Sequence, residues 1–92
     1  MSPRVVPAAV RLLLVDDSEI FTSMMRSAAA RVPSVEVVGV ARDGLEGVAM
    51  AKALRPDVIS MDVYMPVLGG VEAVERIMDE AATPIAMVTG AE

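Results

Sequence analysis

Acidic side chains that could share one metal ion occur at two places in the sequence. Asp16 and Asp17 directly follow the apolar segment 11–15, and Asp62 directly follows the largely apolar segment 57–61. Carboxylates held close together repel one another, and a divalent cation removes that conflict. Mg²⁺ prefers oxygen ligands and uses one or two carboxylates directly, whereas a soft transition metal is usually bound by His or Cys. The three acids therefore predict a Mg²⁺ site.

Asp62 could also act as a nucleophile, because an aspartate can form an acyl phosphate in phosphoryl transfer. Such a transfer needs in-line positioning and neutralisation of charge on the phosphoryl oxygens. A hydroxyl at Thr89 could contribute, and Gly90 beside it leaves space for the phosphoryl group. Each residue alone is equally typical of a turn, a helix cap or a strand end. Their joint placement favours a site.

Four apolar segments have the length and composition of buried strands: 11–15, 35–40, 57–61 and 84–88. Three helices are predicted between them. The first is capped by Ser18 and ends at Pro33, the second begins at Asp43 with Glu46 in a capping-box spacing and ends at Pro56, and the third follows a turn-rich loop over 63–70. The helix positions expected to face the core are Ile20, Phe21, Met24, Met25, Ala28, Val32, Leu45, Val48, Ala49, Leu54, Val71, Val74, Ile77 and Met78.

The regular alternation of strands and helices predicts an α/β fold, with right-handed crossovers and a parallel sheet covered on both faces. In such a sheet the carboxyl ends of the strands lie along one edge, and ligands bind there. Asp16, Asp17, Asp62 and Thr89 each follow a predicted strand. We therefore expect them to converge although they are far apart in the sequence.

Composition limits the other functions. The chain has 92 residues, enough for one small domain, and a net charge of −5 with eight scattered basic residues, which argues against nucleic-acid binding. Without Cys or His, disulfides, thiolate chemistry, zinc sites and histidine catalysis are excluded. We find no convincing signal peptide and no apolar run of membrane-spanning length. We expect a cytoplasmic protein that has no membrane partner, with a flexible leader over 1–9 and a domain over 10–92.

Three segments resemble the signatures of the receiver domain of two-component response regulators: VDDS at 15–18, PDVISMDVYMP at 56–66 and PIAMVTG at 84–90. The resemblance covers 10–90. It implies a flavodoxin-like, three-layer α/β/α fold with strand order 2-1-3-4.

The resemblance also implies roles for individual residues. Asp62 would be the phosphoacceptor, and Thr89 would be the switch hydroxyl that moves toward the phosphoryl group. Asp17 would ligate Mg²⁺ directly, Asp16 directly or through water, and the backbone carbonyl of Tyr64 would complete the protein ligands. The partner would be a histidine kinase that donates the phosphoryl group. Such a chain signals and is not an enzyme beyond its own phosphorylation.

Segments 38–44, 65–70 and 76–78 look most similar to receivers joined to a chemotaxis methylesterase, which implies an output domain in a longer parent. Gly69 departs from the family pattern, since receivers commonly carry Asp there, and we expect only a local change in the loop. The sequence stops at Glu92, where a receiver continues through a helix, a strand and a final helix. The phosphate-contacting lysine of the family lies in that part, and Lys52 cannot replace it.

We therefore expect a partial receiver of about four βα units in which the edge of the fourth strand and part of one sheet face are exposed. Exposed edges and apolar patches favour self-association. The main alternative is a receiver-like interaction or oligomerisation module that is not phosphorylated. A phosphatase with an aspartyl-phosphate intermediate is a third reading, but such enzymes resemble Asp-x-Asp, and the residue two after Asp62 is Tyr64. Incorporation of phosphate that is lost in Asp62→Asn separates the first two, and steady release of phosphate from an ester indicates the third.

Overall fold

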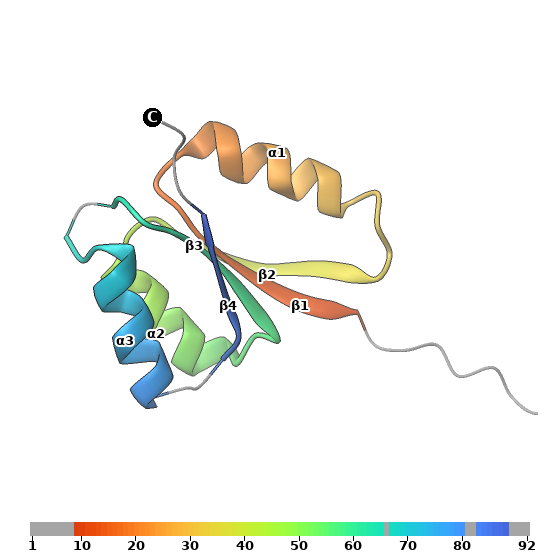
Figure 1. Cartoon of the computed structure of the whole chain (residues 1–92). Helices are drawn as coiled ribbons and strands as arrows, with labels where there is room; N and C mark the ends of the chain where they lie inside the picture. The colour runs from red at the N-terminus through yellow and green to blue at the C-terminus, as the bar shows by residue number, and fades with distance from the viewer. Residues whose placement is uncertain (1–8, 66, 81–82, 89–92) are drawn as a thin grey trace, which may run out of the picture.

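The computed structural model describes residues 9–65, 67–80 and 83–88, so the predicted leader lies outside it except for Ala9. Within these residues the elements in chain order are β1 (Val10–Val15), α1 (Glu19–Ala29), β2 (Val35–Ala41), α2 (Gly44–Leu54), β3 (Val58–Asp62), α3 (Gly70–Glu80) and β4 (Ile85–Val88) (Figure 1). All strand pairs are parallel, and the sheet order is β2-β1-β3-β4. The predicted α/β fold and strand order are confirmed.

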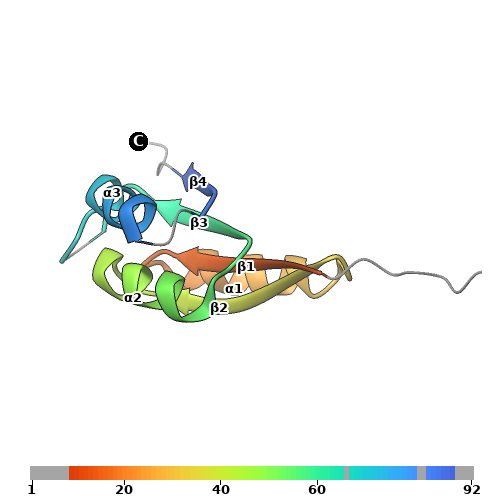
Figure 2. The same ribbon diagram turned by 90° about the horizontal axis from the view of Figure 1, so that it is seen from below.

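The helices lie in two layers around the sheet. α2 and α3 pack together on one face, and α1 lies on the other (Figures 1 and 2). Because side chains alternate between the faces of a strand, the fully buried Leu13 and Ile59 belong to the core under α2 and α3, whereas the equally buried Leu14 points to the opposite face. The main core is therefore the layer between the sheet and α2–α3.

The predicted helix caps form. The Ser18 hydroxyl accepts a hydrogen bond from the Phe21 amide at 3.2 Å, and the Asp43 carboxylate accepts one from the Glu46 amide at 2.7 Å. The reciprocal bond of the capping box differs from the usual pattern, in which the acid accepts from the amide of the cap residue itself. Here Glu46 accepts from the Arg42 amide, one residue earlier, at 2.7 Å. The start of α2 is thereby fixed to the end of β2.

The predicted core faces of the helices are partly wrong. Val48 and Ile77 are buried, and Phe21, Met25, Leu54 and Val74 are half-buried, as expected. The predicted core positions that are exposed instead are Ile20, Met24, Ala28, Val32, Leu45, Ala49, Val71 and Met78. In α2 and α3 the reason is that small residues make the closest contacts and are buried: Gly44, Gly47, Ala51, Gly70 and Ala73. Among the described residues α1 is the one helix on its side of the sheet, so its outer positions have no neighbouring helix to cover them.

The end of α2 is held by an arginine that interrupts the apolar run of β1. One guanidinium nitrogen of Arg11 donates to the carbonyls of Leu54 and Arg55 at 2.8 and 2.9 Å, and its backbone amide donates to the Asp57 carboxylate at 2.8 Å. The last carbonyls of a helix have no partner within the helix and carry partial negative charge. Arg11 therefore caps α2 from a neighbouring strand.

We expect Arg11→Met, which keeps the apolar stem of the side chain, to lower the free energy of unfolding by about 1–3 kcal/mol, the usual range for hydrogen bonds to a charged group. Urea denaturation followed by circular dichroism measures this change. Arg11→Lys keeps the charge and should lose less. Equal stability of Arg11→Met and the wild type would show that the cap contributes nothing.

Candidate metal centre

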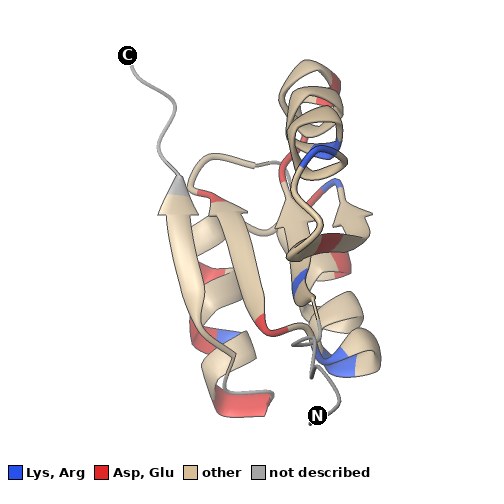
Figure 3. Ribbon diagram, turned by 90° about the vertical axis from the view of Figure 1, so that its right-hand side faces the viewer, with Lys and Arg blue, Asp and Glu red and all other residues tan. Residues whose placement is uncertain are grey.

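The three predicted acids meet at the carboxyl edge of the sheet. Asp16 and Asp17 follow β1, Asp62 ends β3, and these two strands are neighbours in the sheet. One carboxylate oxygen of each residue lies within 4.8 Å of those of the other two. In Figure 3 acidic residues lie at the arrowhead ends of the parallel strands, and others lie along the helices and at the opposite end of the sheet. The parallel topology therefore brings the three acids together, as the sequence predicted.

The three carboxylates have different surroundings. Asp16 is 7% exposed, and its Oδ1 accepts a hydrogen bond from the Ser18 amide at 2.8 Å, which fixes its orientation. Asp17 is exposed to solvent, and one of its carboxylate oxygens lies beside those of Asp16 and Asp62. Asp62 is half-buried, and its Oδ1 accepts from the Tyr64 amide at 3.3 Å. One acid is thus fixed, one is open and one is partly shielded.

The pKa of Asp62 is raised above its ordinary value of 3.8. Burial is the largest cause, and the negative charges of Asp16 and Asp17 add to it, while the hydrogen bond from the Tyr64 amide acts in the opposite direction. The cluster therefore carries like-charge repulsion that a cation would relieve. The donors are hard oxygens, which suit Mg²⁺.

Two further residues of the predicted site are Tyr64 and Thr89. The Tyr64 amide is directed at Asp62, and its side chain is 72% exposed, but a metal contact by its carbonyl stays a prediction. Val88, the last residue of β4, is in register with Asp62. Thr89 comes next in the sequence and lies outside the described residues, so its role as a switch hydroxyl also stays a prediction.

The backbone at the start of α3 packs directly against the backbone of Asp62 and Val63 at the end of β3. The Gly70 amide donates to the Val63 carbonyl at 3.0 Å, and a Cβ placed on Gly70 would lie 2.2 Å from the Asp62 carbonyl oxygen. From the sequence, Gly70 was predicted only as part of a turn, and this contact was not predicted. The signal that could have found it is a glycine that opens a helix directly after the site loop. A Cβ on Gly69, the residue that departs from the family pattern, would meet nothing closer than 3.9 Å.

Val67, in the same loop, has a φ of 70° and is 77% exposed. A β-branched residue in this left-handed region is an outlier and costs about 1–3 kcal/mol. Its neighbour Leu68 is only 7% exposed, and Met65 packs against the core, so both sides of Val67 are anchored. No feature of the sequence indicates the φ of Val67, which was therefore not predicted.

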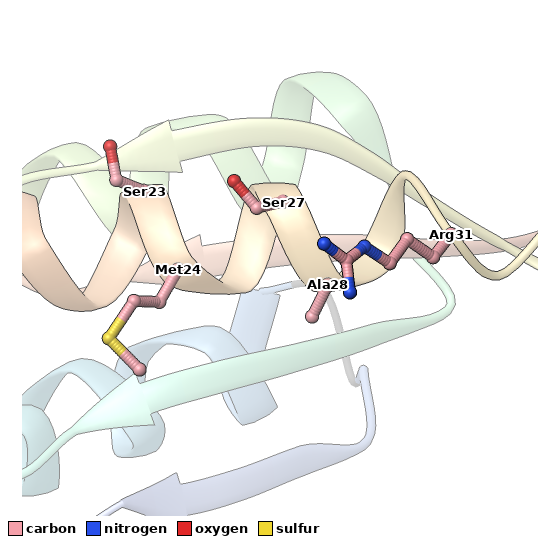
Figure 4. A pocket seen from close by; sticks show the side chains of 5 residues that line it. All are labelled: Ser23, Met24, Ser27, Ala28 and Arg31. Atoms are coloured by element: carbon pink, nitrogen blue, oxygen red, sulfur yellow. The ribbon is translucent and has the colours of Figure 1, made fainter.

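A surface hollow of about 370 Å³ lies away from these acids, along α1. The side chains that line it all belong to α1 or the residues just after it (Figure 4): Ser23, Met24, Ser27, Ala28 and Arg31. The acid cluster lies beyond the other end of this helix, where Ser18 caps it. The hollow therefore has no part in the candidate metal centre.

Comparison with known proteins identifies the class to which this fold and site belong. Residues 12–92 match the family model of the response regulator receiver domain, and the chain belongs to that family. The resemblance stated from the three sequence signatures is thus confirmed.

Within the family, the chain is similar to receivers of chemotaxis methylesterases. It is 48% identical over 80 residues to the protein-glutamate methylesterase/protein-glutamine glutaminase 5 of Geobacter metallireducens. The aligned region covers 87% of this chain and 22% of that protein. The response regulator domain of Thermotoga maritima CheB has a TM-score of 0.86 and 44% identity, covering 88% of this chain and 60% of that one. The receiver domain of Mycobacterium tuberculosis NarL also has a TM-score of 0.86, at 30% identity, covering 94% of this chain and 70% of that one.

The chain spans about 22% of the length of the first of these relatives. The methylesterase activity in the name of that relative is a property of the longer protein. In the part of the chain that the structure describes, each helix is too short to cross a membrane.

Proposed function

We propose that Asp62 accepts a phosphoryl group from the phosphohistidine of a histidine kinase, with Mg²⁺ held beside it. The observation that carries this proposal is the approach of three carboxylates to within 4.8 Å at the ends of β1 and β3, in the fold of the receiver family. The chain is then a signalling component, and we propose no substrate turnover for it.

The proposed transfer is a displacement at phosphorus. A carboxylate oxygen of Asp62 attacks in line, the bond between phosphorus and the imidazole nitrogen of the donor breaks, and the imidazole leaves with that electron pair. Asp16, Asp17, Asp62 and the Tyr64 carbonyl are the residues that would hold Mg²⁺, which supplies neutralisation of the phosphoryl oxygens when bound. The bond from the Ser18 amide holds Asp16 in place, and the Tyr64 amide orients Asp62. Thr89 would donate its hydroxyl to the phosphoryl group.

Incubation with acetyl phosphate and Mg²⁺ tests the proposal, with intact-protein mass as the readout. We expect the mass to rise by one phosphoryl group in the wild type and in the matched control Asp79→Asn, an exposed acid of α3. Asp62→Asn should stay unlabelled. A folded wild-type chain that takes no phosphoryl group, or equal labelling of Asp62→Asn, would contradict the proposal.

The second candidate is a receiver-like interaction module that is not phosphorylated. The observation in its favour concerns Lys52, the only lysine in the sequence. Its ammonium group pairs with Glu80 at 2.8 Å and joins α2 to α3, so it is engaged in a structural ion pair. A positive charge for the phosphoryl oxygens would have to come from elsewhere. The labelling experiment decides between the two candidates.

We also propose a cellular setting. The likeness to methylesterase receivers supports an output domain in a longer parent and a role in chemotaxis signalling. The net charge of −5 supports a partner other than nucleic acid. The phosphodonor would be a histidine kinase acting in the cytoplasm, where we place the chain.

We propose that the chain self-associates through the exposed edge and face of its sheet. Among the described residues, α1 is the one helix on its side of the sheet, and β4 is an edge strand without a charged residue. Ala86 of β4 is exposed, as are Ile20 and Met24 of α1 at 76% and 64%. An uncharged edge beside exposed apolar side chains favours pairing with another chain.

We expect the apparent mass of the 92-residue chain in light scattering to increase with concentration, and Ala86→Lys to reduce this increase because it places a charge on the edge strand. Ala49→Lys, on the exposed side of α2, is the matched control and should behave as the wild type. A monomer at all concentrations would show that the edge and the sheet face do not drive association.

A further inference from the structure

Helix α1 carries an exposed stripe of side chains in addition to its buried side. The stripe consists of Ile20, Met24, Ser27 and Arg31, and all four residues are exposed. Their spacing of four, three and four residues places them on one face of the helix. The residues of α1 that are buried or half-buried lie on another face: Phe21, Thr22, Met25 and Ala29. We refer to the four exposed residues as the α1 stripe.

The α1 stripe includes the surface hollow of about 370 Å³ described above. Figure 4 shows Ser23 and Ser27 along one margin of the hollow, Met24 and Ala28 along the other, and Arg31 at the end that follows the helix. The middle of the hollow is lined by the small residues Ser27 and Ala28, whereas the side chains one turn away on either side are long. The hollow therefore has the size and shape to receive a side chain from another helix.

A second copy of α1 supplies a side chain that fits this hollow. When two copies lie antiparallel with Met24 of one over Ser27 of the other, two-fold symmetry makes the same contact a second time, so both hollows are filled together. The same register places Ile20 of each copy against Arg31 of the other, where the apolar stem of the arginine can cover it. The α1 stripe is thus complementary to itself.

The charges at the two ends of α1 favour the same arrangement. Asp17 and Glu19 are exposed at its start, and Arg26 and Arg31 are exposed near its end. The side chain of Glu19 remains 79% exposed in its pair with Arg42, so it is open to a second cation. Antiparallel packing places the acidic end of each copy beside the basic end of the other, whereas parallel packing would place like charges together.

We propose that the α1 stripe is a contact between two copies of this chain, packed antiparallel with Met24 of each copy in the hollow of the other. This inference rests on the proposed self-association and names the helix contact through which it occurs. One pair of helices buries little surface, so the dimer is expected to be weak and reversible. A helix of another protein is the less favourable occupant, because the hollow, the side chain that fits it and the opposite charges all belong to α1.

The first test fills the hollow. Sedimentation equilibrium of the 92-residue chain over a range of concentrations gives the dissociation constant of the dimer. Ser27→Arg places a long, charged side chain where Met24 of the second copy would lie, and it should raise this constant by about tenfold or more. Ala49→Arg makes a similar change at an exposed position of α2 and is the matched control, which should be unchanged. Circular dichroism checks that each variant is folded.

The second test exchanges the charges at the two ends of α1. Glu19→Arg and Arg31→Glu each place like charges together at both ends of the antiparallel contact, so each should raise the dissociation constant by about tenfold. The double variant Glu19→Arg/Arg31→Glu restores opposite charges at both ends. Its dissociation constant should return to within about threefold of that of the wild type.

Each outcome has a distinct meaning. Weakening by Ser27→Arg together with recovery in the double variant supports the antiparallel α1 contact, and a double variant that does not recover overturns it. Equal association of Ser27→Arg and the wild type, with Ala86→Lys still reducing association, also overturns the α1 contact and leaves self-association to the edge strand. A wild-type chain that is monomeric at all concentrations contradicts self-association itself and leaves the α1 stripe to a helix of another protein. The measurements need no phosphodonor, so they are independent of the role proposed for Asp62.

Discussion

Gly70→Ala is expected to lower the free energy of unfolding by about 1–3 kcal/mol or more, the range for overpacking at a tight contact. A Cβ on this residue would lie 2.2 Å from the Asp62 carbonyl oxygen and 2.9 Å from the Cα of Val63. Both are backbone atoms, so a side-chain rotation cannot relieve the contact. The start of α3 has to move away from the end of β3, and Asp62 moves with it. Urea denaturation measures the loss of stability.

Gly69→Ala is the matched control one residue away. Its Cβ would meet nothing closer than 3.9 Å, and the backbone of Gly69 does not have a positive φ. Alanine has fewer conformations in the unfolded chain, but it is a poorer residue than glycine at this position, where the Gly69 carbonyl accepts from the Ala73 amide at the start of α3. The two effects oppose each other, so we expect a change of less than about 1 kcal/mol. Similar losses for both substitutions would contradict the backbone contact of Gly70.

Mg²⁺ is expected to stabilise the folded chain strongly. At one hundred times its dissociation constant, an ion that binds only the folded state raises the free energy of unfolding by about 2.7 kcal/mol. For a domain of this size that corresponds to a rise in melting temperature of roughly 10–20 °C. Thermal melts with and without Mg²⁺ measure it. Asp62→Asn, which removes one of the three carboxylates, should show a smaller rise, and Asp79→Asn should behave as the wild type. An equal rise in all three proteins would place the ion elsewhere.

Without Mg²⁺, the raised pKa of Asp62 gives the pH dependence a definite sign. A carboxyl whose folded-state pKa is above its unfolded value favours the folded state while it is protonated, below the ordinary value of 3.8. This contribution is lost as the pH rises through the folded-state pKa, because burial and the neighbouring acids oppose the negative charge. Asp62→Asn should therefore be more stable than the wild type near neutral pH, and the difference should disappear at low pH. A difference that stays constant with pH would contradict this account.

The pattern of the sequence was sufficient to predict the alternating α/β fold with a parallel sheet and the meeting of Asp16, Asp17 and Asp62. Both depend on features that are local and repeated, namely apolar segments of strand length, helix caps at Ser18 and Asp43, and acids placed directly after strands. In a parallel sheet, the topology then fixes which strand ends share an edge. The family resemblance added the strand order and the roles of the individual residues.

The parts that could not be predicted depend on distances between elements that are remote in the sequence. Leu45 and Val71 have the size and spacing of core residues, yet the helices approach the sheet through glycine and alanine, which leaves these larger side chains outside. Arg11 is a charged residue in an otherwise apolar strand, and its partners, the carbonyls of Leu54 and Arg55, are evident only in the three-dimensional structure. The φ of Val67 follows from the anchoring of its neighbours and not from its own type.

The bonds of Gly44 to Leu68 and of Gly70 to Val63 also have a kinetic consequence. One loop is joined by its backbone to the first residues of two different helices, so neither helix can unwind at its start without releasing the loop behind Asp62. Local opening in proteins occurs in such cooperative units. The amide hydrogens of Gly44 and Gly70 should therefore exchange with solvent at similar rates, although 26 positions separate them in the sequence numbering. A phosphoryl group on Asp62 would slow or accelerate both together.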